Sequence, residues 1–350
     1  MKMKVEHGDL SPYTQGLDDS HVGNTKLVPH LGPHQNEGLH VELLKVYLEL
    51  GVVVKKVHRL WSFAQTDFCA EWIRRLASDR AKAATAGDAV AARTHKLTGT
   101  SLYGKFLQRV HQTDITLHLD VTKFLNGVND YRCVDWDIID NGSAFMGTVT
   151  KKREGVPVTT ARPVGWAILE LAKAHMYRAW YHGVAQVWPR ARLLMTDTDS
   201  LVFEVEDDEP CRRLRQANAD GKLYVQFDLR GVKANDGRYN HALGALKIEA
   251  ECVLEYQGIA AKLARLRTPG EDIIKSRGIP ARALPQPNAF DDALHDPMGQ
   301  PALKHRRIVS RGHSVTVEET QHRGLACIND KVWQLSFDRS RPLGHWRNRV

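Results

Sequence analysis

Two aspartates one residue apart, Asp197 and Asp199, are the residues whose spacing most directly suggests chemistry. They stand between two short apolar runs, 190–196 and 201–206, and this pattern predicts a β-hairpin with both carboxylates at its turn. Like charges this close are tolerated when a divalent cation neutralises them, and carboxylate oxygens suit Mg²⁺. The pair therefore predicts a magnesium site, although a solvated turn is the simpler interpretation of Asp197-Thr-Asp-Ser200 taken alone.

A D-x-D pair also occurs in other metal sites. An EF-hand loop requires an acidic or amide residue and then a glycine after D-x-D-x, and Leu201 and Val202 stand there instead. A nucleotide-sugar glycosyltransferase holds a metal and a diphosphate with a D-x-D that follows a strand, so it stays open as an alternative. It predicts a parallel α/β sheet, whereas the hairpin predicts antiparallel pairing.

A second polar group is predicted to lie on a helix. Lys96, Thr100 and Tyr103 follow one another at i, i+4 and i+7, which places them on one helical face. A lysine and a hydroxyl on neighbouring turns can bind a triphosphate, and an aromatic ring one turn further can pack against a base or a sugar. An amphipathic helix with a glycine stop at Gly104 explains the same residues without a function. The triphosphate-binding hypothesis is therefore favoured only when the aspartate pair is considered with them.

The hydrophobic pattern predicts the elements that must hold these groups. The predicted helices cover 41–50, 68–86, 88–103 and 164–181, the middle two forming a helical hairpin and the last starting at Pro163 and ending at Gly183. β-branched and aromatic residues predict a strand over 52–63 and strands with turns over 105–160, including a turn at 140–142. Residues 1–40 and 280–301 are predicted to be loops.

Composition narrows the class of protein. With 350 residues, 42% hydrophobic and 26% charged, the chain is that of an ordinary globular protein with two or three subdomains, neither disordered nor fibrous. No apolar run suggests a membrane span and the first residues lack a signal-peptide core, so an intracellular location is expected. The 5 cysteines form no C-x-x-C pair, which argues against a disulfide framework or a zinc site.

The positive charge is concentrated near the C-terminus. The net charge is +8, and residues 301–350 hold ten Lys and Arg against four acids, hence six of the eight net charges. Such a segment is expected to contact the phosphates of a nucleic acid.

In their order, these features resemble the C-terminal polymerase region of family B DNA polymerases. The branch is the protein-primed one of organellar and viral elements, linear plasmids and Maverick/Polinton transposons. Asp197-Thr-Asp-Ser200 matches that family's metal-binding D-T-D-S, and Lys96-x-x-x-Thr-Ser-x-Tyr-Gly104 is similar to its K-x-x-x-N-S-x-Y-G. Supporting segments, in the same order as in the family, are Leu10–Tyr13, Lys56–Arg59 with Phe63, Pro163–Lys173 and Gly344–Trp346.

The resemblance implies an α+β fold with a palm that carries an antiparallel sheet and a catalytic hairpin, a fingers hairpin and a thumb. Its parts would be an N-terminal segment at 1–40, palm at 41–66, fingers at 67–105, palm or insertion at 106–160, the D-T-D-S palm at 161–260 and a basic thumb at 261–350. The implied reaction is template-directed nucleotidyl transfer from dNTPs to a DNA primer with two Mg²⁺ ions, and a terminal protein is an implied priming partner.

The resemblance also assigns roles to residues. Asp199 is the direct metal ligand and Asp197 a weaker or water-mediated one. Lys96 contacts the triphosphate, Tyr103 lines the nascent base pair, and Thr100 and Ser101 complete the dNTP site. The implied DNA contacts are Lys262, Arg306, Arg307 and Arg311.

Several positions depart from the family pattern. The family's D-x-x-S-L-Y-P motif, which carries its other catalytic Asp, is absent, and so is an exonuclease domain. Thr100 replaces the fingers Asn, the Tyr usual before D-T-D-S is replaced at Met195-Thr196, and Ala264 replaces the Tyr of K-x-Y. Because two carboxylates cannot form a cage for two divalent ions, the chain is expected to be a fragment or relic that is inactive alone. The non-enzymatic alternative is a polymerase relic that binds DNA in a salt-sensitive way without incorporating nucleotides.

Overall fold

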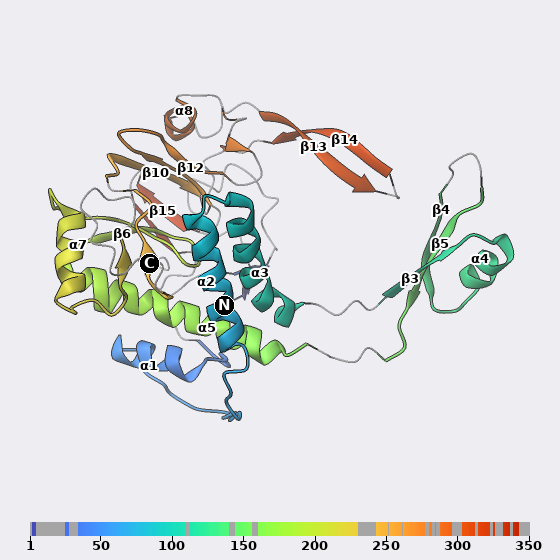
Figure 1. Ribbon diagram of the computed structural model, residues 1–350, viewed down its shortest axis with the longest axis horizontal. Coiled ribbons are helices and arrows are strands. Elements are labelled where there is room, and N and C mark those ends of the chain that lie inside the picture. The colour runs from blue at the N-terminus through green and yellow to red at the C-terminus, as the bar shows by residue number, and fades with distance from the viewer. Residues whose placement is uncertain are drawn as a thin grey trace. The chain divides into compact units, whose positions relative to one another are not determined.

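The computed structural model shows a mixed α+β chain with small, mainly antiparallel sheets (Figure 1). It describes residues 2–4, 25–27, 34–108, 113–139, 144–155, 160–229, 243–250, 252–260, 262–276, 280–281, 284, 288–295, 303–311, 314–322, 325, 332–336 and 339–342. The chain divides into two units. The terminal unit comprises Met1–Gly38, Ala250–Arg307 and Glu319–Val350, and the central unit comprises Leu39–Glu249 and Ile308–Glu318.

Helix α5 (Arg162–Ala179) is an 18-residue helix on which other elements of the central unit pack. Pro163 lies in its first turn as predicted, where a missing N–H costs nothing. The helix does not end at Gly183, because a π-helical turn (Trp180–Val184) and the short α6 (Ala185–Val187) continue it. Helix α1 (Val41–Glu49) packs on α5 through Leu43, Val46 and Ala174.

Helices α2 (Ala70–Thr85) and α3 (Ala89–Leu107) form the predicted helical hairpin (Figure 1). The backbone N–H of Ala91 donates to the carboxylate of Asp88 over 2.9 Å, so Asp88 caps α3. Gly87, with φ +76°, provides the left-handed conformation that the turn between the helices requires. The last turn of α3 reaches α5 at Gly165, where a Cβ would lie 2.6 Å from Leu107 Cγ.

Along the chain, the segment between α3 and α5 forms a small α/β module. Strands β3 (Thr113–His118), β4 (Cys133–Ile138) and β5 (Gly147–Lys152) form an antiparallel sheet in the order β3-β5-β4. Helix α4 (Val121–Val128) covers one face, with Phe124 packed edge-on against Trp136 at 5.9 Å. The strands were predicted over 105–160 but α4 was not, because its eight residues are too few to establish a helical period. The predicted turn at 140–142 lies outside the described residues.

The module contains a carboxylate whose protonation should affect its stability. Asp130 Oδ2 accepts hydrogen bonds from Arg132 Nη2 at 2.8 Å and Lys151 Nζ at 2.9 Å. These contacts, above all the one from Arg132, hold the pKa of the Asp130 carboxyl well below its usual range. A carboxyl with a lowered folded pKa contributes stability above its unfolded pKa of about 3.9, and that stability is lost as the pH falls toward the folded pKa.

Asp130→Asn should therefore lower the melting temperature at about pH 7, and its difference from wild type should shrink toward about pH 2. Scanning calorimetry over this pH range measures the difference. Asp137→Asn, which removes an exposed carboxylate of β4, is the matched control. A deficit of Asp130→Asn that stays constant down to the lowest pH would contradict the assigned ion pairs.

The rest of the central unit forms the core beneath the acidic turn. Strands β6 (Arg192–Thr196) and β7 (Leu201–Glu204) pair antiparallel, followed by α7 (Pro210–Ala219) and a short parallel pair, β8 (Phe227–Asp228) with β9 (Leu246–Lys247). Buried residues of this core come from the end of the α5 extension, α7 and the strand region after it; they are Val184, Trp188, Cys211, Leu214, Ala217, Leu223, Phe227 and Leu229.

The terminal unit is built from short strands and one helix. Strands β10 (Glu255–Ala260), β11 (Leu263–Arg267) and β12 (Ile273–Lys275) form an antiparallel sheet, and α8 (Ala289–His295) packs on β10. Two further pairs are β1 (Lys2–Lys4) with β2 (Thr25–Leu27), and β15 (Val332–Ser336) with β16 (Arg339–Pro342). Strands β13 (Leu303–Arg311) and β14 (Ser314–His322) also pair, and this hairpin is divided between the units, since Ile308–Glu318 belong to the central one. Buried Arg265 joins sheet and helix, since its guanidinium bonds Asp272 at 2.6 Å and Asp291 at 3.2 Å.

Three predictions of local structure are wrong. Residues 52–63 form no strand, because no described segment pairs with them. The predicted loop over 280–301 contains α8, whose Ala289, Phe290 and Ala293 are buried. The predicted N-terminal loop contains β1 and β2, a pairing that its loop-like composition did not indicate. None of the helices in the described part of the chain is long and apolar enough to cross a membrane.

Candidate functional site

The turn between β6 and β7 holds the two aspartates close together, as the sequence predicts. Asp197 N–H donates to the Ser200 carbonyl over 3.2 Å, and the Asp197 carbonyl accepts from Asp199 N–H at 2.6 Å and from Ser200 N–H at 3.1 Å. The Ser200 hydroxyl also donates to this carbonyl at 3.2 Å. The backbone of Asp197 thus closes the turn, while the Asp199 side chain is exposed.

Thr198, between the aspartates, has an unusual backbone conformation. Its φ is +55°, a value that is rare for residues with a Cβ and rarer still for β-branched ones. The hydrogen bond from Asp199 N–H to the Asp197 carbonyl closes a three-residue turn around it. A glycine would adopt this conformation without strain, whereas the exposed threonine adopts it within a turn closed by the backbone hydrogen bonds of residues 197–200. Such strained residues cluster at functional sites, which sets this turn apart from an ordinary solvated one.

The base of the hairpin is fixed by aromatic packing. The ring of Phe203 in β7 lies 5.9 Å from that of Trp180 and 6.3 Å from that of Trp188. The Trp188 indole Nε1 donates to Asp207 Oδ2 over 2.8 Å. This contact, the largest of several, holds the pKa of the Asp207 carboxyl below its usual range. The acidic turn is therefore anchored to the extension of α5.

The carboxylates fit one Mg²⁺ ion better than two. Asp199 is exposed and Asp197 half-buried, and the Thr198 hydroxyl donates to Asp197 Oδ1 over 3.3 Å. Among the described residues, no group of three or more His, Cys, Asp or Glu side chains could hold a metal ion. Mg²⁺ commonly binds one or two carboxylates and completes its shell with water and substrate phosphates. Asp197 and Asp199 suit that arrangement, whereas a two-metal cage needs further anionic ligands.

Helix α3 carries the second predicted group. Lys96, Thr100 and Tyr103 are exposed and lie on one helical face, as predicted. The Thr100 hydroxyl donates to the Lys96 carbonyl over 3.1 Å, so that hydroxyl is engaged by its own helix. Lys96 forms no ion pair with any described residue. Within the described part of the chain, its ammonium is therefore open to an anionic ligand.

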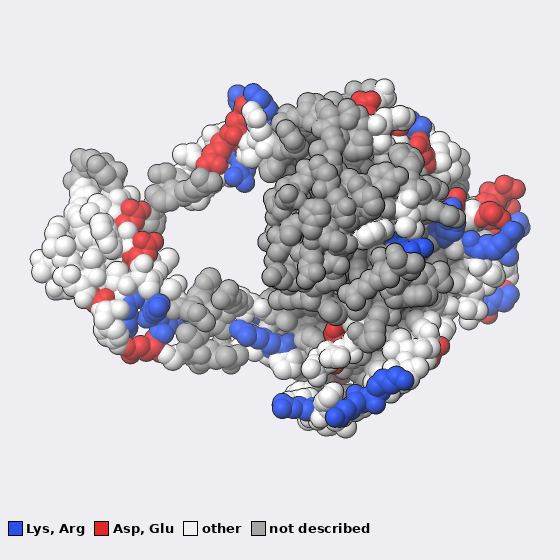
Figure 2. Space-filling view, turned by 180° about the vertical axis from the view of Figure 1, so that it is seen from behind, with Lys and Arg blue, Asp and Glu red and all other residues white. Residues whose placement is uncertain are grey.

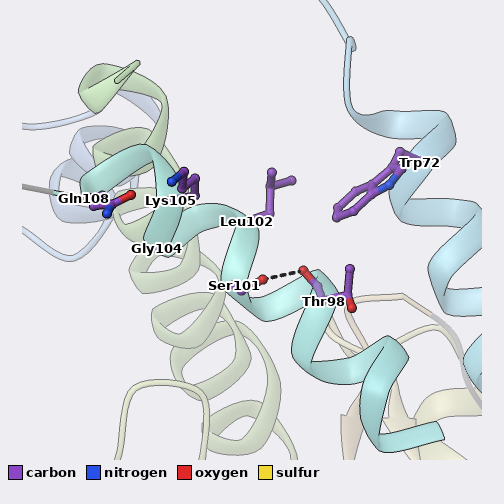
Figure 3. A pocket seen from close by; sticks show the side chains of 7 residues that line it. All are labelled: Trp72, Thr98, Ser101, Leu102, Gly104, Lys105 and Gln108. Carbon is purple, nitrogen blue, oxygen red and sulfur yellow. Dashed lines mark hydrogen bonds between the residues drawn. The ribbon is translucent and has the colours of Figure 1, made fainter. Parts of the chain in front are cut away.

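Ser101 does not share that face. Its hydroxyl donates to the Thr98 carbonyl over 2.9 Å, and it lines a separate pocket of about 500 Å³ between α2 and α3. Figure 3 shows Trp72 of α2 facing Leu102 of α3 across this pocket, with Lys105 further along α3. Sequence reasoning did not separate Ser101 from Thr100, because both stand in the same short motif.

Replacing one glycine of α3 and one glycine of α5 by alanine should change the stability in opposite directions. At Gly104, within α3, an added Cβ meets nothing within 4 Å, so Gly104→Ala should raise the free energy of unfolding by about 0.5–1 kcal/mol. At Gly165 the added Cβ would collide with Leu107, so Gly165→Ala should lower it by about 1–3 kcal/mol. Urea unfolding followed by circular dichroism measures both. Equal signs for the two variants would contradict the packing of α3 on α5.

The predicted DNA contacts lie in two places. Lys262 is exposed in the tight turn between β10 and β11, where its φ is +63°. Arg306 and Arg307 are exposed on β13, and Arg311 is the last residue of that strand. Glu319 of β14 lies 3.5 Å from Lys304 and 4.0 Å from Arg306, so its carboxylate offsets part of this charge. On the face drawn in Figure 2, basic and acidic side chains of the described residues both occur, and several basic ones gather along the lower edge of the view.

The members of each predicted group lie close to one another, but no hydrogen bond or ion pair between the two groups is seen among the described residues. Asp197 and Asp199 share one turn, and Lys96, Thr100 and Tyr103 share one helical face, but no ion pair joins Lys96 to Asp199. The supporting segments Leu10–Tyr13 and Gly344–Trp346 lie outside the described residues. Comparison with protein-family models, with curated proteins and with solved structures finds no match to this chain.

Proposed function

We propose that the β6–β7 turn and the exposed face of α3 are parts of the nucleotide site of a DNA-directed DNA polymerase of the protein-primed family B type. In this proposal β6, β7 and α5 belong to the palm, α2 and α3 are the fingers, and the basic segment 261–350 acts as a thumb on the primer-template. The observation that carries the proposal is a pair of aspartates at the strained tip of an antiparallel hairpin.

The antiparallel hairpin also argues against the glycosyltransferase alternative. That hypothesis needs the D-x-D pair at the end of a strand in a parallel sheet. Strands β6 and β7 pair antiparallel, with Thr196 opposite Leu201 on either side of the turn. The aspartate pair lies at the tip of this antiparallel hairpin and not at the end of a parallel strand, so the prediction specific to a glycosyltransferase is not met.

In the proposed site each residue has a separate task. Asp199 and Asp197 would hold Mg²⁺, which when bound neutralises triphosphate charge and promotes ionisation of the primer 3′-hydroxyl. The Lys96 ammonium would bind the triphosphate from the fingers side. Tyr103, one turn away, would pack against the base or sugar. Because the described residues offer two suitable carboxylates, we expect dNTP binding without efficient incorporation by this chain alone.

Calorimetric titration with dATP and Mg²⁺ tests the binding step. Lys96→Ala should weaken binding about tenfold or more, since a hydrogen bond to a charged group contributes about 1.5–3 kcal/mol. Lys105→Ala, which removes the same charge from the opposite side of α3, is the matched control and should bind like wild type. Equal affinity of wild type and Lys96→Ala would overturn the assigned role of Lys96.

Primer extension tests the catalytic part. We expect no template-dependent incorporation from primer-template, dNTPs and Mg²⁺. Incorporation that Asp199→Ala abolishes would overturn the expected inactivity and support the polymerase site directly. Salt-sensitive DNA binding with no dNTP binding would instead favour the non-enzymatic DNA-binding alternative.

A further inference from the structure

The connection between α1 and α2 is unusual for its length and lack of structure. From Val52 to Asp67 the chain contains no helix, strand, turn or bend, and it follows an open path between the two helices (Figure 1). At its ends, Val52 N–H donates to the Tyr47 carbonyl over 2.9 Å and the Asp67 carbonyl accepts from Ala70 N–H at 2.8 Å. Between them, residues 53–66 form no hydrogen bond with any described part of the chain. The segment is thus anchored at both ends and unpaired in between.

The side chains of this segment are unusually apolar for an exposed connection. Val57 is 67% exposed, Leu60 91% and Trp61 70%, and Val53 and Phe63 are similarly uncovered. β-branched and aromatic residues of this kind favour strands, where they pack on a neighbouring strand. Large apolar side chains gathered in this number on one exposed segment are typical of an interaction surface. The segment therefore has the composition of a strand and a backbone that pairs with no described part of the chain.

We propose that residues 53–63 are a docking edge for an extended, acidic β-strand of a partner protein. Lys55, Lys56 and Arg59 give the segment a positive charge, and no Asp or Glu occurs between Leu50 and Thr66. An added strand would satisfy the open backbone groups and cover the apolar side chains, as in β-strand addition. The basic residues favour an acidic partner, because opposite charges across paired strands attract. This proposal does not depend on the proposed polymerase function.

The spacing specifies the partner further. In an extended strand Val53, Val57 and Trp61 share one face with Lys55 and Arg59, since alternate residues point the same way. The complementary strand would alternate acidic and apolar residues on its facing side, with acids four positions apart. A second copy of the chain fits poorly, because antiparallel self-pairing centred on Val57 would place Lys55 opposite Arg59.

Two synthetic peptides provide the probe. The acidic one repeats Thr-Val-Thr-Glu over eleven residues, and the basic one has Lys in place of Glu. Fluorescence anisotropy of the labelled peptides with the full chain should show that the acidic peptide binds at least about tenfold more tightly than the basic one. Lys55→Glu/Arg59→Glu should reverse this preference. Arg80→Glu, a charge reversal at an exposed position of α2, should leave it unchanged.

A proline variant separates strand pairing from simple charge attraction. In Val57→Pro/His58→Pro both neighbouring N–H groups are lost, so either edge of the segment is blocked. The fold should survive, because neither N–H has a partner within the described chain, and circular dichroism checks this. Binding of the acidic peptide should fall about tenfold or more. Undiminished binding by the proline variant, or binding of neither peptide by wild type, overturns the proposal.

Two specific results would identify a different occupant of the segment. Sedimentation that shows a dimer of wild type and a monomer of the proline variant would identify a second copy as the occupant, and would overturn the acidic-strand proposal. Tighter binding of a single-stranded oligothymidine than of the acidic peptide, lost on Trp61→Ala, would identify nucleic acid and overturn it as well.

Discussion

Asp199→Asn is expected to remove the stabilisation of the chain by Mg²⁺. An ion that binds only the folded chain raises its stability with concentration, by about 1.4 kcal/mol at ten times the dissociation constant. The β6–β7 turn offers Mg²⁺ two carboxylates, and the Asp199 side chain is exposed to solvent. Replacing Asp199 removes the proposed direct ligand and halves the charge of the pair. The melting temperature of wild type should therefore rise with Mg²⁺, while that of the variant should not.

Without metal, the melting temperature of Asp199→Asn should no longer lie below that of wild type. Without a cation, Asp197 and Asp199 repel each other across the three-residue turn around Thr198. Asp199→Asn removes this repulsion, so its melting temperature in chelator should equal or slightly exceed that of wild type. Asp208→Asn, at an exposed acid beyond the same hairpin, makes the same charge change and should keep the full response to Mg²⁺. A response of Asp199→Asn equal to that of wild type would show that the turn is not the metal site.

Elements with a strong local signal could be predicted from the sequence. Asp88 and Pro163 mark helix starts by their own chemistry, and both α3 and α5 begin there. The β6–β7 hairpin was predictable because two apolar runs flank a short polar turn. Each of these signals lies within a few residues, so it does not depend on what packs against the element.

Elements that depend on distant partners could not be predicted. Residues 52–63 have a strand's composition, but a strand needs a neighbour and the described chain supplies none. Helix α8 has seven residues, and its position follows from Phe290 entering the core and Asp291 bonding Arg265. The candidate site shows the same limit, since adjacent Thr100 and Ser101 end on different faces of α3. The positive φ of Thr198 carries no sequence signal, because threonine rarely adopts it.

Trp188→Ala is expected to lower the free energy of unfolding by about 3–5 kcal/mol, because it empties a large buried site. Trp188 is 5% exposed and belongs to the core beneath the hairpin. Its ring supports Phe203 of β7, and its indole N–H bonds Asp207. Urea unfolding measures the loss. Because β7 loses its support, the response of the melting temperature to Mg²⁺ should weaken too, although both aspartates remain.

Trp188→Phe separates packing from the hydrogen bond to Asp207. The smaller ring keeps most of the contact with Phe203, so the loss of stability should be well below that of Trp188→Ala. The lost N–H is the largest cause of the lowered pKa of Asp207, so that pKa should rise in the variant. A carboxyl whose folded pKa is lowered contributes stability above its unfolded pKa of about 3.9. The free energy of unfolding of wild type should therefore exceed that of Trp188→Phe most at neutral pH, and the two should converge as the pH falls. A stability difference independent of pH would mean that packing alone, and not the bond to Asp207, anchors the hairpin at Trp188.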